Sequence, residues 1–291
     1  MKQAMTYEEK YKMMVETPVN KLIPRLAVPT IISMLITSIY NMADTFFVSQ
    51  LSTSASGAVG VNFSLMAMIQ AIGFTLGMGS GNYMSRMLGA KEQDKAQRAC
   101  STAVYTAFVF GFLLAVFGIW NINALVRALG ATETIAPYAR DYGQYILIAA
   151  PYMTVSFVFN NHLRSQGNAA LSMLGITAGG VLNVILDPVL IFGFELGISG
   201  AAIATIFSQF VSFLILLTLV VRSRNVLKPH PKFFTMKGWV YKEILSAGMP
   251  TLGRQGLASV ASVLLNVASS GFGDAAVAAM SIVTRIMMFI N

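Results

Sequence analysis

Long stretches without charge constrain this chain more than any other feature of its sequence. Between Arg25 and Arg86 the only charged residue is Asp44, and from Ala99 to Val126 there is none. About 20 apolar residues suffice for a helix to cross the hydrocarbon core of a bilayer. Only 11% of the 291 residues are Asp, Glu, Lys or Arg, against roughly 25% in soluble domains. The sequence therefore predicts an all-α, polytopic membrane protein whose helices contact the lipid bilayer.

Composition also argues against soluble enzymes and nucleic-acid binding. The net charge of +8 comes from basic residues between the apolar stretches, not from one basic face, so we expect no nucleic-acid partner. Cys100 is the only cysteine, which excludes an intrachain disulfide and cysteine-based zinc sites. His162 and His230 lie beside basic residues of expected loops, and no pair of nucleophile and base stands out. We therefore expect neither an enzyme nor a bound cofactor.

Hydropathy divides the chain into eight expected membrane helices. Gly and Pro interrupt several of them, which membrane helices tolerate when neighbouring groups satisfy the freed backbone. We expect the helices at 26–48, 58–85, 99–126, 142–160, 171–194, 198–221, 245–272 and from 275 onward. The predicted units are a cytoplasmic N-terminal segment (1–24), a six-helix N-lobe (25–221), a basic cytoplasmic linker (222–243) and the start of a C-lobe (244–291).

A weak internal repeat supports this two-lobed design. An ungapped shift of 221 residues lays Pro29-Thr30 on Pro250-Thr251 and Ser38 on Ser259. An even number of helices separates the two copies, so both copies enter the membrane from the same side, as in a parallel repeat. The second copy is unfinished at Asn291. We therefore expect that further C-lobe helices, or a second chain, are required.

Lys and Arg are distributed unevenly between the expected loops. The N-terminus, the loop after the second helix and the basic linker carry most of them, whereas the loops on the opposite side carry only Arg127 and Arg140. Cytoplasmic loops retain an excess of Lys and Arg. We therefore expect a multi-pass protein of the plasma (inner) membrane with its N-terminus in the cytoplasm.

Two carboxyl groups lie inside expected membrane helices, where a charge costs several kcal/mol. The helical rise places Asp44 and Asp187 roughly 24 to 27 Å from the cytoplasmic end, so they share a depth. Asn183 lies one turn before Asp187, and Pro188 removes the helical donor of the Val184 carbonyl. A satisfied contact between helices would explain these residues. A proton or cation site would also explain them, because burial favours the neutral acid, a cation favours the anion, and these oxygens suit Na⁺.

Two further polar residues are candidates for lining a cavity. Asn41 lies three residues before Asp44 and forms a lesser version of the Asn183 arrangement. Arg254 lies within the seventh expected helix, where a charged side chain should face a cavity or a carboxylate.

Several motifs taken together resemble the multidrug and toxic compound extrusion (MATE) family. The similarity extends from about Pro24 to the C-terminus. The resemblance implies two six-helix lobes, of which this chain supplies the N-lobe and the first one to two helices of the C-lobe. It also implies an antiporter that exports small cationic amphipathic drugs in exchange for H⁺ or Na⁺. The motifs are Asp44-Thr45, Met87-Leu88-Gly89-Ala90-Lys91, Leu163-Arg164-Ser165-Gln166-Gly167-Asn168 and the stretch from Asn183 to Pro188.

The resemblance also implies a coupling-ion or proton site. Its first-helix acid falls on Asp44, and its fifth-helix amide and acid fall on Asn183 and Asp187. The family site also uses a fourth-helix Asn and a sixth-helix Thr, which we place by spacing on Asn160 and Thr205. Two alternatives remain: a flippase for a lipid-linked sugar, from a related two-lobed family with a more cationic cavity, and a truncated membrane product that transports nothing.

Overall fold

The structure, a computed structural model, describes residues 16–222 and 227–290. These residues form helices and connecting loops without a strand, which confirms the expected all-α fold. Five helices in the described chain are long and apolar enough to cross a membrane. The elements are α2 (Val19–Ser49), α3 (Thr53–Gly89), α4 (Gln93–Trp120), α5 (Ile122–Ala128), α6 (Ala136–Ser165), α7 (Ala169–Pro188), the π-helix η1 (Val189–Gly193), α8 (Gly197–Arg222), the 3₁₀ helix η2 (Pro231–Phe233), α9 (Gly238–Ser270) and α10 (Asp274–Ile290).

Each expected membrane helix has a counterpart among the long helices. The third expected helix is divided, because α4 ends at Trp120 and the short α5 follows it. Ser52 begins α3, where its side chain accepts a hydrogen bond from the Ala55 N–H and caps the helix. α9 begins at Gly238, within the segment that we expected to be linker.

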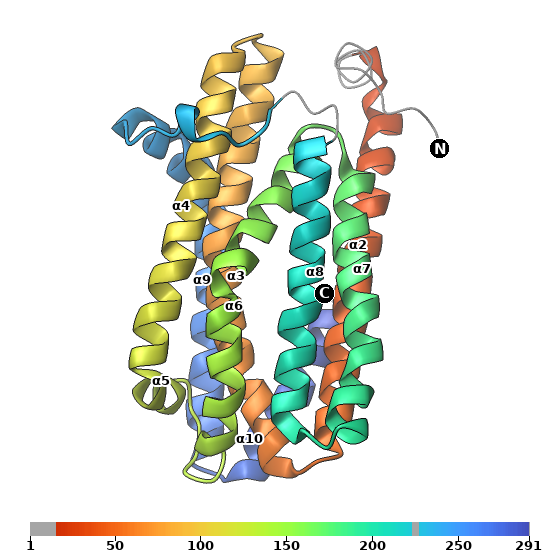
Figure 1. The fold of residues 1–291 in the computed structure, drawn as a ribbon, viewed down its shortest axis with the longest axis vertical. Helices are drawn as coiled ribbons and strands as arrows, with labels where there is room; N and C mark the ends of the chain where they lie inside the picture. The colour runs from red at the N-terminus through yellow and green to blue at the C-terminus, as the bar shows by residue number, and fades with distance from the viewer. Residues whose placement is uncertain (1–15, 223–226, 291) are drawn as a thin grey trace.

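The long helices run side by side (Figure 1), with α2, α7 and α8 on one side of the view and α3, α4 and α9 on the other. α6 joins the two groups, because it packs against α3, α4 and α8. α9 lies along α3, and α10 packs against α3 and α2. Buried apolar side chains form two core clusters, one around Tyr142 and Ile146 and one around Met84 and Leu163.

Glycines let these helices approach closely. A Cβ atom at Gly73 or Gly77 of α3 would come within 3.1 Å of a backbone carbonyl oxygen of α6. A Cβ atom at Gly179 of α7 would meet a carbonyl oxygen of α8 at the same distance. Small residues at such crossings allow membrane helices to pack backbone to backbone.

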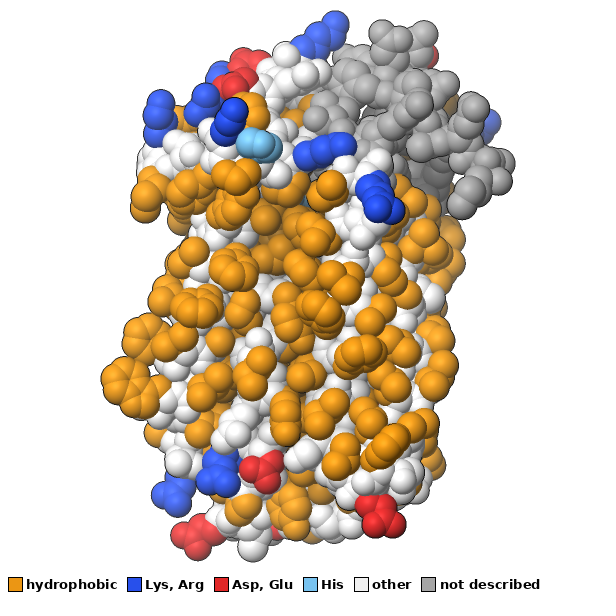
Figure 2. All heavy atoms as spheres, in the orientation of Figure 1, with side chains coloured by type: hydrophobic (Ala, Val, Ile, Leu, Met, Phe, Trp, Pro, Cys, Tyr) orange, Lys and Arg blue, Asp and Glu red, His pale blue; other side chains and the backbone are white. Residues whose placement is uncertain are grey.

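On the face shown in Figure 2, hydrophobic side chains cover the middle of the molecule in a broad belt, and charged side chains gather at its two ends. Phe46, Phe117 and Trp120 are among the exposed large apolar residues of the described chain. An exposed apolar surface of this extent suits lipid rather than water. The structure thus has the surface of a multi-pass membrane protein.

The two ends differ in charge. We call the end that carries η2 the linker end and the opposite end, which carries α5, the α5 end. Lys and Arg side chains gather at the linker end, whereas acidic side chains predominate at the α5 end (Figure 2). Part of the expected basic cluster falls on residues 1–15 and 223–226, outside the described residues.

His162 and its basic neighbour Arg164 belong to the last turn of α6 rather than to a loop. α6 continues to Ser165 and carries His162 into the bundle. The His162 Nε2 lies 2.7 Å from the Ser80 Oγ, and its Nδ1 lies 3.6 Å from the Cys100 Sγ. All three side chains are buried, and we call them the His162 cluster. The polar residues around His162 resemble a loop in sequence. In the structure the partners of His162 lie on the neighbouring helices α3 and α4.

Candidate functional site

Two helices each carry a buried carboxyl group toward the α5 end of the bundle. Asp44 lies near the end of α2 and Asp187 near the end of α7, and these two helices pack against each other. Asp187 has 0% of its surface exposed and Asp44 has 5%. The two carboxyl groups are near enough for their charges to interact. Leaving aside Arg25 and Arg285, whose side chains the structure does not describe, they are the only buried residues among Asp, Glu, Lys and Arg within residues 16–222 and 227–290.

Asn183 joins Asp187 to α8. The Asn183 Nδ2 donates to the Asp187 Oδ1 at 3.2 Å and to the Thr205 Oγ1 at 3.4 Å. Asn183 and Asp187 lie one turn apart, so both side chains face the same side of α7. The structure therefore brings together Asp44, Asn183, Asp187 and Thr205, which we call the Asp187 cluster.

Some oxygen atoms of this cluster receive no hydrogen bond from the described residues. They are the Asp187 Oδ2 and the Asn183 Oδ1, and the same holds for the Oγ of Ser208, one turn along α8 from Thr205. Buried polar atoms in folded proteins nearly always have a partner, so each exception needs an explanation. Carboxylate, amide and hydroxyl oxygens are the ligands that Na⁺ and similar hard cations prefer. The donor set therefore fits a small cation or a proton.

Tyr142 is a member of this site that the sequence did not single out. Its hydroxyl lies 3.5 Å from the Thr205 Oγ1, and the side chain is buried on α6. A tyrosine within an apolar helix carries no sequence signal that separates it from a core residue. The contact links α6 to the Asp187 cluster.

The backbone changes its geometry directly after Asp187. α7 ends at Pro188, and the next five residues, Val189–Gly193, form the π-helix η1. Pro188 supplies no N–H, so the α-helical hydrogen bonds cannot continue in full. π-Helical turns are frequent at functional sites. Pro188 predicted the interruption, but the form of the interruption is visible only in the structure.

The structure does not bring Asn160 into the Asp187 cluster. The Asn160 Nδ2 donates to the carbonyl oxygen of Ser172 at 3.2 Å. Ser172 precedes Asp187 by 15 residues on α7, which corresponds to about 22 Å of helix. Since α6 and α7 run in opposite directions, Asn160 meets α7 at the linker end, while Tyr142 meets α8 at the α5 end. Spacing alone could not distinguish these two positions.

The two candidate cavity residues, Asn41 and Arg254, lie on α2 and α9. The Asn41 Nδ2 donates to the Thr37 carbonyl at 2.9 Å, and the Asn41 carbonyl accepts from Thr45. Arg254 is exposed on α9, and no ion pair joins it to an acid among the residues that the structure describes. Arg254 therefore makes no ion pair with a carboxylate of the described chain, and its expected place at a cavity stays a prediction.

The arrangement can be compared with known proteins. The sequence model of the MatE family matches residues 29–189, which contain Asp44, Asn183 and Asp187. The chain belongs to the MatE family. The multidrug export protein MepA of Staphylococcus saprophyticus is 29% identical over 264 residues, which are 90% of this chain and 58% of that protein. MepA of Staphylococcus aureus strain MRSA252 is 27% identical over 275 residues, which are 94% of this chain and 61% of that protein.

Solved MatE family structures share the fold of this chain. An inward-facing multidrug resistance MATE transporter superposes with a TM-score of 0.82 and 29% identity, over 92% of this chain and 61% of that chain. An outward-facing one superposes with a TM-score of 0.81 and 26% identity, over 97% and 66%. This chain thus spans less than two thirds of each of these MatE relatives. The resemblance predicted from the sequence motifs is confirmed.

Proposed function

We propose that this chain acts in a secondary antiporter that exports small cationic amphipathic compounds across the plasma membrane in exchange for H⁺ or Na⁺. The Asp187 cluster carries this proposal, because it holds two interacting buried carboxyl groups together with buried oxygens that have no described partner. The family membership and the multidrug export proteins among the relatives support it. The proposal includes further C-lobe helices, or a second chain, that complete the two-lobed transporter.

Asp187 is the proposed coupling residue. Two carboxylates held close together away from water repel each other, so binding of one proton or one cation stabilises the pair. An ion bound there would give the Asp187 Oδ2 and the Asn183 Oδ1 the partner that the described residues do not supply. Thr205 orients the Asn183 amide from α8. Ion binding therefore acts on the contact between α7 and α8.

This contact can couple ion uptake to a change of conformation. An ion shifts an equilibrium between two states only by the difference between its affinities for them. If α8 moves relative to α7 between the outward-facing and inward-facing states, the Thr205 to Asn183 contact changes, and the ion affinity changes with it. The bound ion then favours one state, and its release favours the other.

We also propose that the linker end faces the cytoplasm. Lys and Arg gather at this end, as cytoplasmic segments do. In this orientation Asp44 and Asp187 lie in the outer half of the membrane. An ion that arrives from outside would have a short path to them.

The sign of the buried charge bears on the cargo. A lipid-linked sugar is anionic and requires a cationic cavity. The structure buries two acids, Asp44 and Asp187, and it buries no Lys or Arg among the described side chains, which do not include those of Arg25 and Arg285. Arg254, the residue that could favour an anionic cargo, is exposed. This charge pattern favours a cationic cargo over a lipid-linked sugar.

Replacing Asp187 with Asn tests the proposal. Asn has nearly the same size but cannot carry a negative charge. Cells that express the Asp187→Asn protein at its full natural length are expected to show no resistance to a cationic dye such as ethidium. Glu195→Gln is the matched control, because Glu195 is an exposed acid in the loop that follows η1, and this variant should keep wild-type resistance. Wild-type resistance of Asp187→Asn at equal expression would refute the coupling site.

Purified protein in liposomes separates the two coupling ions. Dye export is measured with a Na⁺ gradient alone and with a pH gradient alone. Export with one gradient identifies the ion. If neither gradient drives export in the wild-type protein, the antiporter proposal fails, and the alternative of a product that does not transport is supported.

A further inference from the structure

One carboxylate at the α5 end joins segments that lie far apart in the sequence. Asp274 is the first residue of α10, and its two carboxylate oxygens accept hydrogen bonds from three hydroxyl groups. The distances are 2.6 Å from Ser54, 2.6 Å from Thr132, and 2.8 and 2.7 Å from Thr134. We call these four residues the Asp274 cluster. It connects the first turn of α3 and the loop between α5 and α6, both in the expected N-lobe, to α10 in the expected C-lobe.

The donors of this cluster are all neutral. Hydrogen bonds from a hydroxyl to a carboxylate are shorter and about twice as strong as those between neutral groups. The hydrogen bonds from Ser54, Thr132 and Thr134 hold the pKa of Asp274 below its usual range. Asp274 is therefore ionised near neutral pH. The cluster joins the two parts of the protein without a salt bridge, so it relies on the geometry of three oxygen atoms around one carboxylate.

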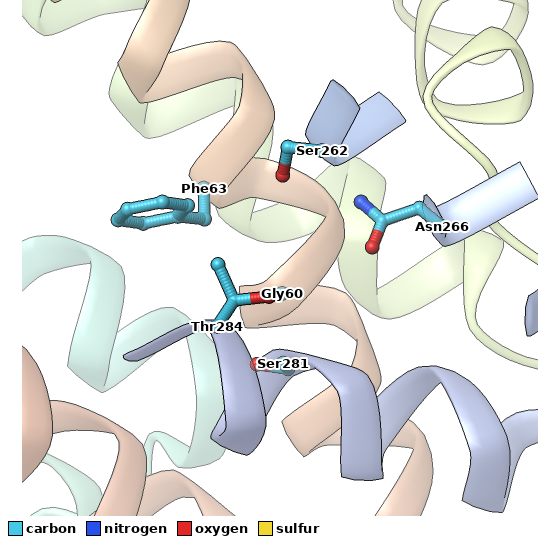
Figure 3. A pocket seen from close by; sticks show the side chains of 6 residues that line it. All are labelled: Gly60, Phe63, Ser262, Asn266, Ser281 and Thr284. Carbon is cyan, nitrogen blue, oxygen red and sulfur yellow. The ribbon is translucent and has the colours of Figure 1, made fainter. Parts of the chain in front are cut away.

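A polar pocket lies deeper in the molecule, between the same helices. Figure 3 shows Gly60 and Phe63 of α3 opposite residues of α9 and α10. Gly60 is six residues from Ser54 along α3, and Ser281 is seven residues from Asp274 along α10. Each separation corresponds to about 10 Å of helix. The pocket thus lies roughly two turns inward from the Asp274 cluster. Its lining residues are Gly60, Phe63, Ser262, Asn266, Ser281 and Thr284.

The pocket is polar but carries no charge. The Asn266 Nδ2 donates to the Ser64 Oγ at 3.2 Å, and the Ser64 Oγ lies 3.2 Å from the Ser262 Oγ. The Ser281 Oγ is buried and has no hydrogen-bond partner among the described residues. An unpaired buried hydroxyl gains a partner when water reaches it. Opening this interface is therefore less unfavourable than opening an apolar one.

We propose that the Asp274 cluster is a latch that closes the outer end of the interface between the N-lobe and the hairpin of α9 and α10. It rests on the antiporter function and the orientation proposed above. The latch is formed when the transporter is closed to the outside. It opens in the outward-facing state, in which Ser54, Thr132 and Thr134 separate from Asp274 and water enters the pocket around Ser281.

The opposite end of the same interface has a different contact. There the Arg86 Nη2 of α3 lies 2.8 Å from the Glu243 Oε2 of α9, and the two side chains are 63% and 42% exposed. Exposed ion pairs of this kind contribute little to stability. The contact joins the same two parts of the protein from the linker end, so Glu243 offers a matched control for Asp274.

Reaction of a cysteine in the pocket tests the latch without a transport assay. The reporter is Ser281→Cys in a Cys100→Ser background, which removes the other thiol. The purified protein in detergent reacts with a small methanethiosulfonate reagent, which reaches both ends of the molecule. We expect Asp274→Ala to increase the reaction rate at least about tenfold, because three charge-assisted hydrogen bonds are lost. Glu243→Gln should leave the rate unchanged.

A rate that Asp274→Ala leaves unchanged would overturn the proposal. Single donor variants keep the test decisive if Asp274→Ala does not fold. Ser54→Ala and Thr134→Val each remove one donor, and each should raise the reaction rate a few-fold. Unchanged rates in both donor variants would also overturn the latch.

A cross-link tests whether the latch must open during transport. The protein for this test carries Cys100→Ser, Thr132→Cys and Asp274→Cys and retains Ser281. A short bifunctional reagent that forms a disulfide with each thiol joins the two cysteines. We expect the cross-linked protein to stop exporting dye and to recover after reduction. Failure to cross-link, or unchanged export after cross-linking, would overturn the latch. The antiporter function can fail separately from the latch. That outcome is no dye export by the wild-type protein, together with a faster reaction of Ser281→Cys when Asp274→Ala is added.

Discussion

The six-helix N-lobe contains two buried polar clusters that differ in how completely their atoms are paired. In the His162 cluster both ring nitrogens face a partner, at 2.7 and 3.6 Å. In the Asp187 cluster the Asp187 Oδ2 and the Asn183 Oδ1 have no partner among the described residues. An unpaired buried polar atom costs about 1 to 3 kcal/mol. The fold therefore retains an unfavourable arrangement at Asp187 that it avoids at His162.

Burial of polar residues therefore does not by itself indicate a functional site. The His162 cluster connects α3, α4 and α6 and satisfies its own hydrogen bonds, so it acts as a structural contact. The Asp187 cluster combines unpaired oxygens with two interacting carboxyl groups, and binding of a cation, as proposed above, would supply a partner to the oxygens and reduce the repulsion between the carboxylates. The combination of charge and unpaired atoms is what points to a ligand.

The largest expected effect separates function from stability at Asp187. Asp187→Asn should reduce ion-driven dye export in liposomes to the level of liposomes without protein. The melting temperature of the purified variant should be equal to or higher than that of the wild type, because a buried charge is removed. Export and thermal unfolding are measured on the same preparation. If the melting temperature falls by several degrees, the carboxyl group is a structural element and the comparison fails.

His162→Ala should have the opposite effect. The substitution leaves a cavity and removes one of the hydrogen-bond partners of Ser80, so we expect a loss of about 2 to 4 kcal/mol in the free energy of unfolding. Export per folded molecule should remain that of the wild type. Thermal or denaturant unfolding followed by tryptophan fluorescence measures the loss, with the exposed His230→Ala as the control. A stable His162→Ala protein without export would give His162 a functional role.

Thr205→Val should have an intermediate effect on ion binding. Valine has the shape of threonine but cannot accept the hydrogen bond from Asn183. The loss of about one hydrogen bond should weaken the apparent affinity for the coupling ion three- to tenfold. The dependence of export on ion concentration measures this shift. Thr205→Ser keeps the hydroxyl and should have the wild-type affinity for the coupling ion. Equal ion affinities of Thr205→Val and the wild type would show that Thr205 does not belong to the ion site.

The smallest expected effect concerns the Asp274 cluster, which is half-buried except at Thr134. Because hydrogen bonds hold the pKa of Asp274 below its usual range, their stabilisation is present above the ordinary Asp value of about 4 and is lost as the pH falls further. Acidification below about pH 4 should therefore lower the melting temperature slightly more in the wild type than in Asp274→Asn. Identical pH profiles of the two proteins would show that these hydrogen bonds contribute nothing in solution.

The site was partly predictable from the sequence. Asp44 and Asp187 stand out in one dimension, because a charge within a long apolar helix is visible without any knowledge of packing. Asn183 follows from Asp187 by helical periodicity alone. Thr205 and Asn160 were both placed by spacing, and the structure brings only Thr205 to Asn183. Position along a helix does not say which neighbouring helix a side chain meets.

The sequence alone determined the class of the protein and the sites of its buried acids. Apolar length and helical rise are local properties, so they can be read from consecutive residues. Helix packing brings Tyr142 to Thr205, encloses His162, and brings Ser54 to Asp274 across 220 residues of sequence. Such contacts depend on which helices pack together and at what depth, and that is settled by the whole bundle.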